Sequence, residues 1–159
     1  DWKGIDLSFL FQAGLGRDVA LTGVYSGGIM DNTQMTKPFY HGGNSPKYLV
    51  ENSWREDNTN AEFPRLSIVQ ASSNNAYSST FWYRSGDYLR LKNLQIGYTF
   101  PQKWMSRIGI DRLRIYFEGQ NLWTVSELTK FNIDPEQPGV SNGYYPQQRI
   151  FSFGVNLAF

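Results

Sequence analysis

The chain ends in the sequence RIFSFGVNLAF, which spans Arg149–Phe159. Apolar side chains occupy every second position of this stretch: Phe151, Phe153, Val155, Leu157 and Phe159. Small or polar residues fill the positions between them. A period of two places these two sets on opposite faces of a β-strand. A strand with one apolar face that ends on an aromatic residue is typical of the closing strand of an outer-membrane β-barrel, whose outer face meets lipid.

Three further segments alternate in a similar way, so the sequence predicts an all-β fold with four strands at about 5–13, 88–100, 112–123 and 148–159. The alternation changes phase between Leu91 and Leu94, which predicts either a β-bulge near Lys92 and Asn93 or a strand start above the membrane. Each segment has about 9–13 residues, whereas about 10 tilted residues cross a bilayer core and soluble strands average about 5–6. The strand lengths therefore favour transmembrane strands.

The alternation in the segment at 112–123 predicts which of its side chains face lipid and which face the lumen of such a barrel. We expect the apolar Leu113, Ile115 and Phe117 to face lipid. The polar side chains that alternate with them are expected to face the lumen: Arg112, Arg114, Glu118 and Gln120. Charges in a crowded lumen need partners, so we expect these residues to pair with one another or with a plug inside the barrel.

The connections between the strands alternate in length. Long connections span about 14–87 and 124–147, and a short one spans 101–110. This rhythm is typical of outer-membrane barrels, in which long loops are extracellular and short turns are periplasmic. In the short connection, Pro101 ends the strand and Gly109 ends one or two helical turns. Trp104 and Ile108 are four residues apart within those turns; they could pack back on the barrel rim, and the favoured interpretation is a capped turn with an interfacial anchor.

The long connections carry the candidate substrate contacts. Aromatic faces stack on sugar rings, and two aromatic pairs of these loops are the candidates: Trp82 with Tyr83, and Tyr144 with Tyr145. The same residues would also suit an interfacial aromatic belt or the surface that meets a partner protein. A short helix is predicted over Ser45–Trp54, with Ser45 as N-cap and Pro46 in the first turn.

Composition excludes several other classes of protein. The net charge of +1 gives no support for nucleic-acid binding. There is no cysteine, and His41 is the one histidine, so we expect no catalytic triad, no cofactor and no metal centre in this chain. The carboxylates of Asp134 and Glu136 flank Pro135 and predict a turn, with a calcium role as the alternative. Aromatic residues make up 16% of the sequence, which suits either membrane girdles or a secreted carbohydrate-binding β-sandwich.

Several motifs resemble the C-terminal region of SusC/RagA-type TonB-dependent transporters. The stretches that carry the resemblance are GDYLRLKNLQIGYTFP at 86–101, LRIYFEGQNLWT at 113–124, DPE at 134–136, YPQQR at 145–149 and the terminal strand. Trp54 together with AEFPR at 61–65 resembles the outer-loop pattern of the same family. The similarity spans essentially the whole chain and is densest after Gly86.

The resemblance implies an outer-membrane barrel of 22 strands, of which this chain supplies the last four. It implies a SusD-like surface lipoprotein above the outer loops, energy from the TonB system and import of an oligosaccharide or a peptide, with no enzyme activity. The plug domain, the TonB box and the N-terminus of such transporters have no counterpart in this sequence, so we expect a longer protein. Phe151, Phe153, Val155, Leu157 and Phe159 resemble the signal that the barrel-assembly machinery reads, and they equally suit contact with outer-membrane lipid. The remaining alternative is a different outer-membrane barrel with a structural or secretion-associated role.

Overall fold

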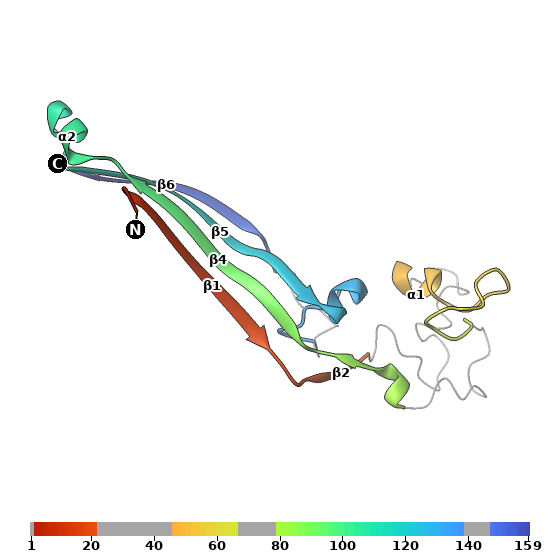
Figure 1. Cartoon of the computed structure of the whole chain (residues 1–159). Coiled ribbons are helices and arrows are strands. Elements are labelled where there is room, and N and C mark those ends of the chain that lie inside the picture. Colours follow the sequence, from red (N-terminus) through yellow and green to blue (C-terminus); the bar gives the residue numbers. More distant parts are fainter. Residues whose placement is uncertain (1, 22–45, 67–78, 139–146) are drawn as a thin grey trace. The chain divides into compact units, whose positions relative to one another are not determined.

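The computed structural model describes residues 2–21, 46–66, 79–138 and 147–159, and it divides the chain into two compact units (Figure 1). The strand unit comprises Asp1–Gly14, Tyr88–Val125 and Tyr145–Phe159. The loop unit comprises Leu15–Asp87 and Ser126–Tyr144.

The strand unit is built on one four-stranded sheet with the order β1-β4-β5-β6. Its strands are β1 (Ile5–Gly14), β4 (Tyr88–Thr99), β5 (Arg112–Ser126) and β6 (Ile150–Ala158). β1 pairs with β4, and β5 with β6, in antiparallel register. β4 and β5 are hydrogen-bonded neighbours joined by the short connection, and Figure 1 shows the four strands side by side. The predicted all-β class with four antiparallel strands is therefore confirmed.

The predicted β-bulge lies in β4. Leu10 pairs with Asn93 and Phe11 pairs with Leu91, so the register passes over Lys92. This single extra residue reverses the alternation along β4. As a result, Leu91 faces the same side as Leu94, which pairs with Phe9. The bulge therefore keeps one face of the sheet apolar along its whole length.

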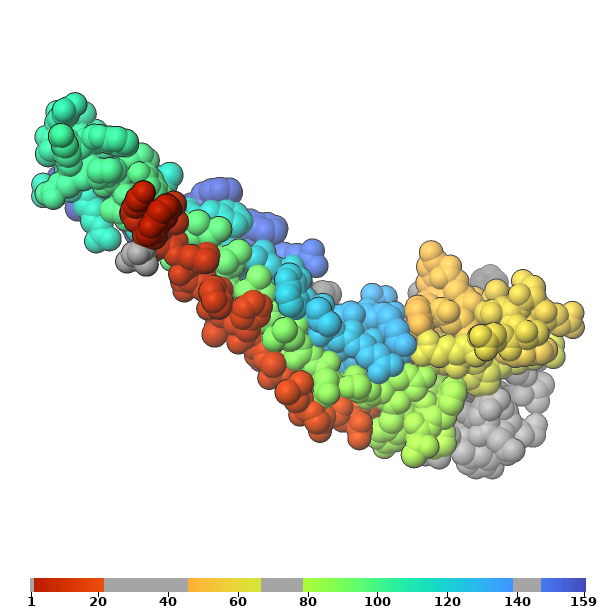
Figure 2. All heavy atoms as spheres, in the orientation of Figure 1, coloured from red at the N-terminus to blue at the C-terminus, as the bar shows by residue number. Residues whose placement is uncertain are grey.

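The apolar face lies uncovered in the strand unit. Phe9 and Val155 are exposed, and Phe153 in the middle of β6 is 82% exposed. In Figure 2 the atoms of β1 (red), β4 (green) and β5 (cyan) lie side by side as one layer. A β-sandwich would bury such a face against a second sheet. The uncovered face therefore argues against the carbohydrate-binding sandwich.

The short connection contains α2 (Gln102–Met105) and a following 3₁₀ turn, η4 (Ser106–Ile108). Gly109 ends it with φ 72°, as predicted. Trp104 is 56% exposed and Ile108 is exposed, whereas Met105 is buried. Neither side chain packs on the sheet of this chain, and their exposure suits the expected interfacial anchor.

A tight turn precedes β1. The N–H of Trp2 donates to the carbonyl of Ile5 at 2.9 Å, and the N–H of Ile5 donates back to Trp2 at 2.9 Å. Lys3 and Gly4 between them have φ of 50° and 88°. Positive φ at both central residues is the geometry of a two-residue β-hairpin turn. A Cβ on Gly4 would lie 2.5 Å from the carbonyl oxygen of Thr99, so glycine is required here.

The loop unit contains short elements around an apolar core. β2 (Asp18–Ala20) pairs with β3 (Tyr83–Ser85), and the remaining elements are α1 (Lys47–Glu51), η3 (Thr80–Trp82) and η5 (Glu127–Phe131). The core consists of Val19, Leu21, Leu49, Phe63, Trp82, Leu128 and Phe131. None of the helices in the described ranges is long and apolar enough to span a membrane.

The helix α1 is shorter than the predicted span Ser45–Trp54. It begins at Lys47, directly after Pro46, and Ser45 lies outside the described residues. It ends at Glu51 because the backbone that follows forms hydrogen bonds with residue Phe63 instead of continuing the helix. The N–H of Trp54 donates to the carbonyl of Phe63, and the N–H of Phe63 donates to the carbonyl of Asn52, both at 2.9 Å.

Candidate functional site

The second face of the four-stranded sheet is polar, and it forms the candidate site. In the register, Asp6 lies opposite Gly97 and Ser8 opposite Gln95, while Arg114 lies opposite Asn156 and Glu118 opposite Ser152. The polar face is defined by these side chains together with those that bond to them: Asp6, Asn93, Gln95, Arg114, Tyr116, Glu118 and Gln120. The alternation of the strands thus separates the two kinds of side chain at the centre of the sheet, with the exception of Leu10, which lies opposite Asn93 on the polar face.

An ion pair crosses three strands at one end of the polar face. Arg114 on β5 donates from Nε to Asp6 Oδ1 at 3.0 Å and from Nη2 to Asp6 Oδ2 at 2.5 Å. The same Nη2 donates to Gln95 Oε1 at 3.1 Å. The pair passes over Gly97 on β4, where a Cβ would lie 2.5 Å from Arg114 Nη2. Glycine on the central strand therefore makes room for this bidentate contact between β1 and β5.

A second polar cluster surrounds Glu118. Its Oε1 accepts hydrogen bonds from Asn93 Nδ2 and Gln120 Nε2, both at 2.9 Å. Farther along the sheet, Gln12 Nε2 donates to the Tyr88 hydroxyl at 3.0 Å. These bonds satisfy a carboxylate and several amides without any group arranged as a nucleophile with its base. The arrangement is that of a rigid polar wall.

The predicted lumen-facing residues are distributed over this face as follows. Glu118 and Gln120 bond to each other, as expected, whereas Arg114 bonds to Asp6 and Gln95 and not to another member of the predicted set. Arg112 is exposed at the start of β5, opposite Ala158. The sequence did not identify Asp6 as the partner of Arg114, because the two are separated by 108 positions.

Tyr116 fills the space above a glycine on the neighbouring strand. The register places it opposite Gly154, and a Cβ on Gly154 would lie 2.2 Å from Tyr116 Cζ. The guanidinium of Arg114 lies 5.1 Å from the centre of the Tyr116 ring. The aromatic ring covers a bare strand backbone in the way that aromatic residues compensate for glycine in designed sheets.

A Gly154→Val variant of the whole transporter is expected to lose about 1–3 kcal/mol of unfolding free energy, because overpacking forces the Tyr116 ring out of place. Urea unfolding in lipid vesicles measures this loss. The matched variant Gly154→Val with Tyr116→Ala should recover most of it. A double variant as unstable as Gly154→Val alone would contradict the contact between ring and glycine.

The candidate substrate contacts Trp82 and Tyr83 differ in accessibility. Trp82 is 5% exposed and stacks on Phe63, with ring centroids 6.2 Å apart at 20°. Its ring belongs to the core of the loop unit and is not free to stack on a sugar. Tyr83 is 52% exposed and remains the accessible candidate of this pair. Tyr144 and Tyr145 lie outside the described residues.

Glu62 is the centre of a charged cluster that joins both long connections. Its Oε2 accepts from the Tyr48 hydroxyl at 2.7 Å, and its Oε1 accepts from Lys130 Nζ at 3.3 Å and Arg84 Nη2 at 3.4 Å. Glu127 lies beside the same two cations, 3.4 Å from Lys130 and 3.8 Å from Arg84. Two carboxylates and two cations thus hold residues of 14–87 against residues of 124–147 within the loop unit.

The cluster shifts the titration of its members. Burial alone would raise the pKa of Glu62, but hydrogen bonds from Tyr48 and Lys130 lower it below the ordinary value of 4.5. The hydrogen bond to Glu62, together with burial, raises the pKa of Tyr48. Burial alone would lower the pKa of Lys130, but its contacts with Glu62 raise it. The charged forms of Glu62 and Lys130 are therefore both favoured by folding.

Acid is expected to loosen the loop unit through Glu62. Because its pKa is lowered on folding, its contribution is present above 4.5 and is lost as the pH falls through the lowered value. Hydrogen–deuterium exchange of peptides containing residues 62, 84 and 130 should quicken by up to about tenfold in acid, after correction for intrinsic rates. Glu62→Gln should show the fast exchange already at pH 7. Glu51→Gln, which removes an exposed pair with Lys47, is the matched control and should change nothing. Exchange in Glu62→Gln equal to that of the wild type would contradict this role.

The described residues offer no metal centre. Within 2–21, 46–66, 79–138 and 147–159, no three potential ligand side chains lie close enough to hold a metal ion. Asp134 instead forms the predicted turn: its Oδ1 accepts from the N–H of Glu136 at 2.8 Å, and its carbonyl accepts from the N–H of Gln137 at 3.2 Å. His41 lies outside the described residues.

A sheet of long antiparallel strands, with one uncovered apolar face and one polar hydrogen-bonded face, defines a wall segment of a transmembrane β-barrel.

Comparisons with known proteins agree with this class. No family model matches the chain. TonB-dependent receptor P3 of Formosa agariphila is 29% identical over 171 residues, covering 99% of this chain and 15% of the receptor. TonB-dependent receptor SusC of Bacteroides thetaiotaomicron is 30% identical over 105 residues, covering 64% of this chain and 10% of SusC.

Solved structures give the same result. The RagAB peptide transporter is similar with a TM-score of 0.64 and 27% identity, covering 100% of this chain and 16% of the transporter chain. The RagAB peptide importer in its closed-closed state has a TM-score of 0.63 and 28% identity. The match covers 99% of this chain and 16% of the importer chain. Over essentially its whole length the chain is therefore similar to a segment of SusC/RagA-like TonB-dependent transporters. It spans about 15% of the length of the first of these curated relatives.

Proposed function

We propose that this chain forms the C-terminal barrel wall of an outer-membrane importer that takes up an oligosaccharide or a peptide. The observation that carries the proposal is the separation of the sheet into an apolar face and a polar face whose charged groups are satisfied by each other. Such a sheet suits lipid on one side and a crowded, wet lumen on the other. The similarity to TonB-dependent receptors and to the RagAB peptide transporter supports uptake driven by the TonB system.

The lengths of the connections support one orientation in the membrane. The tight turn at Trp2–Ile5 and the short connection at 101–110 lie at the same end of the sheet, since Ile5 pairs with Tyr98. The long connections 14–87 and 124–147 leave from the other ends of the strands. In the proposed barrel the short end faces the periplasm and the loop unit lies on the extracellular side.

The proposed partner is a SusD-like lipoprotein that lies over the extracellular loops. The loop unit suits this role because its apolar core and the Glu62 cluster hold described parts of both long connections together. Among the exposed aromatic residues of the unit, we propose Tyr83 for contact with substrate or with this partner. Ordered loops on a rigid barrel are the usual place for recognition.

Native purification tests the proposal. A tag in the 124–147 loop is used to isolate the protein from outer membranes, and mass spectrometry then gives the mass of the intact chain and of its partners. We expect a chain several times longer than this segment, together with a SusD-like lipoprotein. Growth of a deletion strain on defined peptides or oligosaccharides then identifies the class of substrate. Recovery of the protein without a surface lipoprotein would favour an outer-membrane barrel with a structural or secretion-associated role. Recovery of the protein from a soluble fraction would overturn the proposal.

A further inference from the structure

Basic and aromatic side chains gather at the end of the strand unit where the short connections lie. Lys3 is in the turn before β1, while Lys103 and Arg107 are in α2 and η4, and all three are exposed. No ion pair among the described residues involves any of them. Trp2 and Trp104 are exposed beside them, and Lys3 Nζ lies 4.6 Å from the centre of a Trp2 ring. We call Lys3, Lys103 and Arg107 the basic rim; Asp111 is the one acidic residue of the 101–111 stretch.

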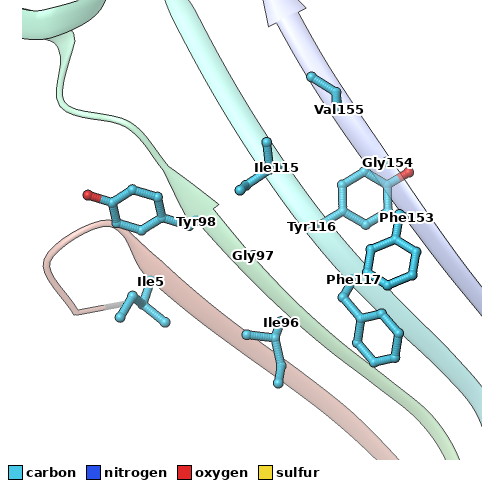
Figure 3. Close-up of a pocket in the computed structure, with 10 residues that line it drawn as sticks. All are labelled: Ile5, Ile96, Gly97, Tyr98, Ile115, Tyr116, Phe117, Phe153, Gly154 and Val155. Carbon is cyan, nitrogen blue, oxygen red and sulfur yellow. The ribbon is translucent and has the colours of Figure 1, made fainter.

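An apolar groove crosses the sheet next to this rim. It has a volume of about 610 Å³, within the range of small-molecule sites. Side chains from all four strands line it, including Ile5, Ile96, Tyr98, Ile115, Phe153 and Val155 (Figure 3). Its lining surface is almost entirely apolar, so a hydrocarbon chain suits it better than a polar substrate.

The groove and the basic rim are close enough to hold one molecule. Ile5 follows Lys3 by two positions and Tyr98 precedes Lys103 by five, and a chain spans at most about 3.6 Å per residue, so at most about 7 Å and 18 Å separate these backbone positions. A lipid whose headgroup lies at the rim would therefore reach the groove with one acyl chain. Unpaired Lys and Arg at a membrane surface attract anionic headgroups, and tryptophan is suited to the same depth.

We propose that the groove and the basic rim together bind an anionic phospholipid, with its phosphate at Lys103 and Arg107 and one acyl chain along Ile96 and Ile115. The proposal rests on the proposed membrane orientation, and it adds a defined lipid site to a face that otherwise meets bulk lipid. The net positive charge of the rim selects an anionic headgroup over a zwitterionic one.

Native mass spectrometry of the whole transporter in detergent, titrated with phosphatidylglycerol or phosphatidylethanolamine of equal chain length, tests the site. Wild type is expected to retain phosphatidylglycerol preferentially. Lys103→Gln with Arg107→Gln should weaken that binding by about fivefold per charge removed. Lys47→Gln with Arg55→Gln, which removes two exposed charges of the loop unit, is the matched control and should leave binding unchanged.

A second variant keeps the test independent of the charges. Ile115→Trp fills the groove and should reduce retention of phosphatidylglycerol while the rim stays intact. Equal retention of both lipids by wild type, or unchanged binding in both variants, would overturn the proposal. Recovery of the transporter with its surface lipoprotein from outer membranes is measured separately. Loss of lipid selectivity with that assembly intact would therefore reject the lipid site alone.

Discussion

Replacing Phe153 with arginine is expected to destabilise the whole transporter by about 2–4 kcal/mol, the typical loss for a basic side chain at mid-depth on the lipid face of a barrel. Phe153 lies near the middle of β6, opposite Phe117, and is 82% exposed. In lipid that exposure is favourable for phenylalanine, whereas arginine must keep a charge in hydrocarbon or distort the bilayer. Urea-driven unfolding in vesicles, followed by tryptophan fluorescence, measures the change.

The adjacent variant Ser152→Arg is the matched control. Ser152 lies opposite Glu118 on the polar face, so an arginine there meets a carboxylate and water. We expect a change within about 0.5 kcal/mol, as for an ordinary surface substitution. Equal losses in the two variants would mean that the faces are not divided between lipid and lumen. A harmless Phe153→Arg would show that the apolar face contacts water or protein instead.

The strands were predictable because period-two alternation is a local signal. The phase change near Lys92 left two explanations open, and the register shift between Leu10 and Phe11 shows that the bulge is the correct one. The sequence could also indicate that Arg114 needs a partner, since an uncompensated charge in such a wall is unfavourable. It could not name Asp6, because that contact depends on the register between β1, β4 and β5.

The loop unit was harder to predict because its order comes from contacts between distant segments. Trp82 and Tyr83 are neighbours in the sequence and look equivalent, yet Trp82 is buried against Phe63 and Tyr83 is exposed. Likewise, nothing local to Glu51 signals the end of α1. The chain leaves the helix there because Trp54 pairs with Phe63. Local patterns therefore gave the barrel wall, and long-range packing decided which loop residues are accessible.

Deleting Phe159 is expected to remove most of the transporter from the outer membrane while changing transport per assembled molecule little. Phe159 follows the last residue of β6 and is 84% exposed, so its deletion removes few contacts within this chain. The alternating residues Phe153, Val155 and Leu157 would remain to face lipid. A large loss of assembled protein would therefore indicate that Phe159 is recognised during assembly. Quantitative immunoblotting of outer-membrane fractions, with uptake normalised to the assembled amount, measures both quantities.

Two variants separate recognition from simple loss of an exposed aromatic ring. Phe159→Tyr keeps an aromatic terminal side chain and should assemble at near wild-type amounts. Trp104→Ala removes another exposed aromatic residue from the short-connection end of the sheet and should also assemble. Normal assembly of the Phe159 deletion would reject the assembly role and leave lipid contact as the explanation for the terminal pattern. If Trp104→Ala lost as much protein as the deletion, the effect would belong to the interfacial aromatic residues in general, because their shared property is an amphipathic ring at the membrane surface.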